Sequence, residues 1–159
     1  MKSEGFTLIE LLVTLAVMVI LVTIAVPGFQ SLLANGRHAA DYNSILSGLT
    51  LARSEAVKSR EKVSFILEQE DGSPPWKYTV ADDGGAEIRI ADSVHETINI
   101  FYDGTAVVKK TITFNSLGRT STDDDCGSGC KVKIEGGSDN CSVISVSAYG
   151  RMGKEECGL

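Results

Sequence analysis

Positive charge is scarce in this sequence. Its 15 lysine and arginine residues face 21 aspartate and glutamate residues, which gives a net charge of −6. Proteins that bind nucleic acid without sequence preference neutralise phosphates, so this balance argues against that class, although it leaves room for a local basic patch. Only two histidines occur, His38 and His95, and neither has a nucleophile or carboxylate at a telling spacing. We therefore expect two surface histidines and no enzyme activity.

The motifs of common cofactor and metal sites are also missing. Gly84-Gly85 lies in no strand-to-helix step with a GxGxxG pattern or a P-loop lysine, so it is interpreted as a turn. The run Asp123–Asp125 lacks the spaced ligands and closing glutamate of a calcium loop and is interpreted as a solvated loop. Cys126 and Cys130 have no Cys-x2-Cys spacing and no histidine beside them, which disfavours zinc. We expect no cofactor and no metal.

Charge is absent from Leu11 to Val26, 16 residues in a row. From Phe6 to Val26 the only charge is Glu10. As a helix, this stretch of 21 residues is about 31 Å long, roughly the hydrocarbon thickness of a bilayer. A small soluble domain seldom buries a helix that is apolar on all sides, so a membrane segment is the better interpretation.

Two ordinary kinds of membrane signal fit this segment poorly. A secretory signal peptide has an apolar core of about 7–15 residues followed by an A-x-A-like cleavage site, and Ala25-Val26-Pro27 is a poor site of that kind. A plain signal anchor fits the length. It gives no reason for Glu10 or for the glycine that precedes the run, Gly5.

The stretch Gly5-Phe6-Thr7-Leu8-Ile9-Glu10-Leu11 closely resembles the N-terminal motif of type IV pilins and pseudopilins. The resemblance implies that a prepilin peptidase cuts between Gly5 and Phe6 and methylates Phe6, while the apolar helix is retained. It also implies that Glu10 pairs with the α-amino group of Phe6 in a neighbouring subunit. This pairing agrees with the rule that charged groups inside membrane segments are normally functional and paired. The alternative is a glutamate that snorkels to the headgroups.

Pro27-Gly28 follows the apolar run and predicts a helix break, because proline removes a backbone hydrogen bond. Pilins commonly carry a proline here, where the helix kinks or melts during assembly. From residue 27 to 62 the pattern is that of an amphipathic helix lying on a sheet. Its apolar stripe has spacings of 4, 3 and 4 and consists of Ile45, Leu49, Ala52 and Ala56.

Three stretches resemble the FimT/FimU/GspH branch of the pilin-like proteins: Leu49–Lys58, Ile112–Arg119 and Cys141–Arg151. Beyond Lys62 the apolar period is two, and turn-forming residues separate short runs. The expected strands are Val63–Gln69, Trp76–Ala81, Glu87–Ala91, Thr97–Tyr102, Ala106–Phe114, Lys131–Glu135 and Ser142–Ala148. We therefore predict an α+β, pilin-like fold in which a long N-terminal helix packs on two antiparallel sheets.

All four cysteines lie in the last 34 residues, behind a membrane-targeting segment, which favours disulfides in an oxidising compartment. Four cysteines allow three connectivities. We favour Cys141–Cys157, which ties the tail across the last strand, together with Cys126–Cys130, which closes a small Gly-Ser-Gly loop.

Binding of DNA needs separate consideration, because some FimT-like minor pilins bind it through a C-terminal Gly-Arg-x-Arg motif. This chain has Gly150-Arg151-Met152-Gly153, so the second arginine is missing. Lys154 follows, but Glu155 and Glu156 offset its charge. Contact of DNA with Arg151 and Lys154 is therefore disfavoured but stays open.

The resemblance implies a minor type IV pilin of the FimU/FimT kind that helps to initiate the filament tip. Its expected partners are other minor pilins, the major pilin, the prepilin peptidase and the inner membrane, with the domain on the periplasmic side. The alternatives are a GspH-like pseudopilin of type II secretion and a DNA-binding subunit for natural transformation. The expected parts are a leader (1–5), a transmembrane and assembly helix (6–26), an amphipathic helix (27–62) and a β-rich region (63–159).

Overall fold

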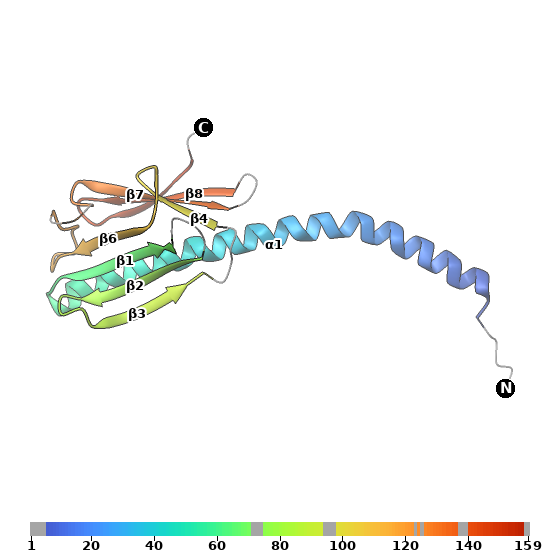
Figure 1. Ribbon diagram of the computed structural model, residues 1–159, viewed down its shortest axis with the longest axis horizontal. Coiled ribbons are helices and arrows are strands. Elements are labelled where there is room, and N and C mark those ends of the chain that lie inside the picture. The colour runs from blue at the N-terminus through green and yellow to red at the C-terminus, as the bar shows by residue number, and fades with distance from the viewer. Residues whose placement is uncertain are drawn as a thin grey trace. The chain divides into compact units, whose positions relative to one another are not determined.

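The computed structural model describes residues 6–70, 75–93, 98–122, 124, 126–136 and 140–157 (Figure 1). The chain divides into two compact units, Met1–Gly36 and Arg37–Leu159. One long helix and two antiparallel sheets confirm the predicted α+β, pilin-like class.

Helix α1, Leu8–Ser59, begins in the first unit. An 18-residue window of the helix has a mean hydropathy of 2.8, and none of that window is buried. By length and composition this helix can cross a membrane.

Pro27 and Gly28 lie inside α1, which continues without interruption to Ser59. The predicted interruption of the helix is therefore wrong for the single subunit, while a kink or melting during assembly stays a prediction. A proline removes only its own N–H from the hydrogen-bond ladder, and the turns on both sides retain their bonds. Hydroxyl groups on both sides also bond to the helix backbone: Thr23 Oγ1 donates to the Ile20 carbonyl at 2.8 Å, and Ser31 Oγ donates to the Gly28 carbonyl at 2.9 Å.

In the second unit, α1 buries one side against the sheets. The buried residues recur at helical spacing and are His38, Asp41, Ile45, Gly48, Leu49, Ala52 and Ala56. The four-residue stripe predicted from the sequence is confirmed, and each of its members is completely buried. His38 and Asp41 extend the stripe toward the N-terminus, so burial by the sheets starts just after the boundary at Gly36.

The first sheet has four antiparallel strands in the order β3-β2-β1-β6. Their bounds are Val63–Gln69 for β1, Trp76–Asp82 for β2, Glu87–Asp92 for β3 and Lys109–Phe114 for β6. Residues of β1 alternate between buried and half-buried, which confirms the predicted period of two. Figure 1 shows this sheet lying along the second part of α1.

Gly48 is the point of closest approach between the helix and this sheet. A Cβ atom at position 48 would lie 2.7 Å from the Tyr78 ring and 2.8 Å from the Phe65 ring. Because real Cβ atoms essentially never come so close, glycine is required here for the two aromatic rings to pack against the helix.

The second sheet has five antiparallel strands in the order β5-β4-β7-β8-β9. Their bounds are Ile98–Tyr102 for β4, Thr105–Ala106 for β5, Gly129–Gly136 for β7, Asn140–Ser147 for β8 and Met152–Glu155 for β9. Two sheets beside the helix were predicted, and both are present.

The predicted strand Ala106–Phe114 is wrong as one strand, because the chain changes sheets within it. Val107 N–H donates to the Ile100 carbonyl of β4, whereas the carbonyl of Val108 accepts from Gln69 of β1, both at 3.0 Å. Val107 is completely buried, so the apolar pattern continues across the crossover and conceals it.

Strand β9 was not predicted. Its four residues, Met-Gly-Lys-Glu, show no alternation of apolar and polar side chains. It forms because β8 offers a free edge, with Val146 opposite Met152 and Val143 opposite Glu155.

Candidate functional site

The N-terminal end of α1 holds the predicted processing and assembly residues. Gly5 lies outside the described residues. Phe6 is 81% exposed. Thr7 immediately precedes the first helical residue, and its Oγ1 accepts from the Glu10 N–H at 3.3 Å. The Thr7 hydroxyl in turn donates to Glu10 Oε2 at 3.5 Å.

This arrangement resembles a capping box, in which a threonine at the N-cap and a glutamate three residues later stabilise the helix start. The N-terminal end of a helix also favours a negative charge. Oε1 of Glu10 makes no hydrogen bond to any described residue. The carboxylate therefore lies on an apolar helix with one oxygen open to an ammonium group.

A second cluster lies where the last turns of α1 meet two distant turns of the chain. Arg53 Nε donates to the Gly118 carbonyl at 3.0 Å. A Cβ atom at position 118 would meet Val57 Cγ2 at 3.0 Å, and one at position 150 would meet the Gly118 carbonyl oxygen at 1.9 Å. Gly118 and Gly150 also have φ values of +70° and +72°, which disfavour residues with a side chain.

This cluster joins the three stretches that carry the FimT/FimU/GspH resemblance, because Arg53, Gly118 and Gly150 each come from one of them. The sequence pattern marks the three stretches, but only the fold brings them into contact. These three residues form a packing joint. The backbones at Gly118 and Gly150 approach closely beneath the Arg53 guanidinium group, and only glycines permit so close an approach.

Arg151 and Lys154, the residues considered for DNA, do not form one surface. Arg151 lines an open pocket together with Asp103, Lys131 and Glu155. Lys154 Nζ lies 5.6 Å from the centre of the Tyr42 ring on α1.

The pocket beside Arg151 contains both signs of charge. Lys131 Nζ lies 2.6 Å from Glu155 Oε2, and this hydrogen bond holds the pKa of the Glu155 carboxyl below its ordinary value. The Lys131 backbone N–H donates to Asp103 Oδ1 at 2.8 Å. A phosphate backbone would meet carboxylates here as well as cations.

The interpretation of His38 as a surface residue is wrong. His38 is buried, and its Nε2 lies 3.1 Å from the Ile134 carbonyl of β7. Because a carbonyl only accepts, Nε2 carries the proton in this contact. Three residues later, the buried Asp41 accepts from Ser93 Oγ at 3.2 Å. A helical spacing of 38, 41 and 45 in the sequence was the signal that could have revealed both. His95 lies outside the described residues.

Asp124 is a structural residue and not part of a freely solvated loop. Its Oδ2 accepts from the Thr113 N–H of β6, and its Oδ1 accepts from the Cys126 N–H at 3.1 Å. Asp123 and Asp125 lie outside the described residues. One carboxylate therefore ties this loop to the edge of the four-stranded sheet.

The four cysteines form the two favoured disulfides, Cys126–Cys130 and Cys141–Cys157, with Cα–Cα distances of 5.1 and 6.0 Å. The longer link joins the start of β8 to the residues after β9. It therefore links the end of β9, the strand that was not predicted, to β8.

Two family models match the chain. One, described as Type II transport protein GspH, covers residues 41–149, and the other, described as Prokaryotic N-terminal methylation motif, covers residues 1–26. The first spans more than half of the 159 residues. The chain belongs to the GspH family. This result confirms the resemblance found in the sequence to GspH-like proteins with the N-terminal methylation motif of pilins and pseudopilins.

The GspH-family fold is also that of FimU. Two crystal structures of the type IV minor pilin FimU from Pseudomonas aeruginosa PAO1 resemble this protein, with TM-scores of 0.55 and 0.53 and 24% sequence identity. The similarity covers 72% of this chain and 89% of FimU in one crystal form, and 73% and 91% in the other. At this identity the likeness shows the fold. No curated protein matches the chain.

Proposed function

We propose that this GspH-family protein is a minor pilin that helps to initiate filament assembly at the tip. In this proposal a prepilin peptidase cuts between Gly5 and Phe6 on the cytoplasmic side and methylates Phe6. The first part of α1 stays in the inner membrane, with the second unit on the periplasmic side, until the subunit enters the filament.

The observation that carries the proposal is the placement of Glu10. It is the only charge on an otherwise apolar helical surface, and one of its carboxylate oxygens has no described partner. In an apolar filament core an isolated carboxylate is costly, and the α-amino group of a neighbouring subunit supplies the missing counter-charge. Cleavage after Gly5 would create that amino group at Phe6.

The test replaces Glu10 by alanine in the full chain. Processing, read from the mass of the N-terminal peptide, should remain intact. Incorporation into sheared filaments should fall about tenfold or more, because truncating one partner of a buried charge pair commonly costs 2–5 kcal/mol. Glu61→Ala, which removes an exposed carboxylate two residues after the end of α1, is the matched control. Normal incorporation of Glu10→Ala would overturn the pairing.

The description of the matched family favours a second candidate, a pseudopilin of a type II secretion system. Both candidates use the same helix, so the neighbours of α1 decide between them. A cysteine introduced at Val17, on the exposed part of α1, would be the only free thiol, since all four native cysteines form disulfides. Cross-linking in cells to minor pilins supports the pilus assignment, and cross-linking to secretion pseudopilins supports the alternative.

A further inference from the structure

Three large apolar side chains are exposed on neighbouring segments of the second unit, where α1 ends. Leu117 and Tyr149 are 71% and 67% exposed, and Val57 is half exposed. They come from three segments that the Arg53 joint holds in contact: Val57 lies against Gly118, and Gly118 lies against Gly150. We call Val57, Leu117 and Tyr149 the apolar triad. Exposed apolar patches of this kind, framed by polar groups, commonly mark interaction sites.

Internal hydrogen bonds fix the backbone of the two turns that carry Leu117 and Tyr149. Asn115 Oδ1 accepts from the Leu117 and Arg119 N–H groups at 3.0 and 3.1 Å, and the Asn115 carbonyl accepts from Gly118 N–H at 2.8 Å. In the other turn, Gly150 N–H donates to the Ser147 carbonyl at 2.8 Å. The backbone positions of Leu117 and Tyr149 are therefore set before any partner arrives, which lowers the entropic cost of binding.

Two guanidinium groups flank the apolar triad. The Arg119 group lies 5.4 Å from the centre of the Tyr149 ring. Arg53 borders Gly118 and lines a hollow on the exposed side of α1 together with Thr50, Ser54 and Val57. Within the described part of the chain, neither arginine forms an ion pair with a carboxylate. The surface is locally cationic on a chain whose net charge is −6.

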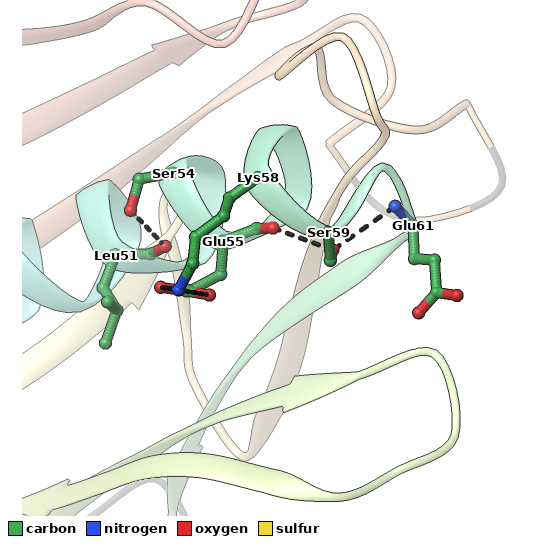
Figure 2. A network of polar contacts seen from close by, with 6 residues as sticks. All are labelled: Leu51, Ser54, Glu55, Lys58, Ser59 and Glu61. Carbon is green, nitrogen blue, oxygen red and sulfur yellow. Dashed lines mark hydrogen bonds and ion pairs between the residues drawn. The ribbon is translucent and has the colours of Figure 1, made fainter.

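The polar side chains next to this surface bond to their own helix. Ser54 Oγ donates to the Leu51 carbonyl at 2.9 Å, and Ser59 Oγ donates to the Glu55 carbonyl at 2.8 Å (Figure 2). Lys58 pairs with Glu55 at 3.1 Å in the same view. Glu55, the carboxylate of the last turns of α1, is thus already paired. This leaves the charge of Arg53 and Arg119 for an external group.

We propose that the apolar triad with Arg53 and Arg119 docks a neighbouring filament subunit, through a segment that carries a carboxylate beside an apolar side chain. Tyrosine and arginine dominate the energetically important residues of protein interfaces, and the two guanidinium groups select an acidic partner. This inference rests on the proposed function, because it assumes that the protein enters a filament.

The test places a photo-cross-linking amino acid at Leu117 or Tyr149 in the full chain, expressed in the native cell. Incorporation into sheared filaments is measured on the same samples. We expect both positions to cross-link to one pilin-type subunit, through a peptide that contains an aspartate or glutamate. Val108, which is exposed and apolar but lies between β5 and β6, is the control position.

Charge reversal makes the assignment specific. Arg119→Glu should lower the yield of the cross-link from Leu117 about tenfold, since like charges at an interface repel. Arg119→Lys should retain most of it. Replacing the cross-linked carboxylate of the partner by lysine should restore the yield in the Arg119→Glu background.

Three other outcomes would refute the proposal that this surface docks a neighbouring subunit. Incorporation into filaments without cross-links from Leu117 and Tyr149 refutes the surface while the proposed function survives. Absence from filaments refutes both. A cross-linked species that nuclease digests, or equal yields from Val108 and Leu117, would assign the surface to nucleic acid or to non-specific contact.

Discussion

The two parts of α1 differ in what covers their apolar side chains. In the first unit, the apolar side chains of one helix are exposed on all sides. In the second unit, the helix buries one stripe against sheets that the same chain supplies. The second unit therefore carries its own core, whereas the first depends on other molecules, lipid or neighbouring subunits, to cover its surface.

The acidic residues of the helix show the same contrast. Asp41 is buried in the second unit and accepts a hydrogen bond from Ser93 of the same chain. Glu10 is exposed in the first unit, and its described hydrogen bonds are only to Thr7, three residues away. A carboxylate with a fixed internal partner stabilises a fold, and one without such a partner is available for assembly.

The strongest test of this comparison is a matched pair of leucine truncations. Leu49 in the second unit is completely buried, and Leu21 in the first is 63% exposed. Leu49→Ala should destabilise the second unit by about 3 kcal/mol, because it leaves a cavity in the core. Leu21→Ala should change that stability by less than about 0.5 kcal/mol.

Urea denaturation of the full chain in detergent measures both effects. The single tryptophan, Trp76, is buried in the second unit, so its fluorescence reports on that unit alone. Equal losses from the two variants would show that the units do not differ as described.

A smaller effect is expected at the joint between α1 and the two turns. Gly150→Ala should destabilise the second unit by about 1–3 kcal/mol, since the residue has a positive φ and its Cβ would collide with the Gly118 carbonyl. Gly85 has a similar φ of +80°, but a Cβ there meets nothing within 4 Å. Gly85→Ala therefore measures the cost of the backbone conformation without the collision. If the two variants lose the same stability, the close approach at Gly150 is relieved at no cost.

Much of this fold could be predicted because local patterns report burial directly. The stripe from Ile45 to Ala56 and the alternation in β1 each repeat with the period of their element. Strand β9 and the crossover at Val107 were not predictable in this way. Both depend on which strand the backbone bonds to, and side-chain polarity does not encode that choice.

The same difference separates the two clusters of candidate residues: one is a local sequence motif, and the other depends on the fold. The residues at the N-terminal end form one continuous motif, so the sequence alone draws attention to Phe6 and Glu10. The joint of Arg53, Gly118 and Gly150 combines positions that are up to 97 residues apart in the chain, from 53 to 150. Only the fold brings them together. His38 was misjudged for a related reason, since its partner is a backbone carbonyl of β7.

The smallest predicted effect concerns an ion pair inside the second unit. The hydrogen bond from Lys131 lowers the pKa of Glu155 in the folded protein below its ordinary value of 4.5. A lowered folded-state pKa means that the pair contributes stability above about pH 4.5, and that this contribution is lost as the pH falls through the folded-state value. Lys131→Met should therefore reduce stability slightly at pH 7, and this reduction should shrink as the pH falls below about 4.5.

Urea midpoints followed through Trp76 fluorescence between pH 7 and 3 measure this difference, and Lys131→Arg should preserve the wild-type profile. Superimposable profiles of Lys131→Met and the wild type would contradict the prediction. The cation that pairs with Glu155 is Lys131 of the same chain, so loss of this ion pair changes the stability of the purified protein. Glu10 is proposed to pair with a cation on another subunit, so loss of that pair should change only the incorporation of the protein into filaments.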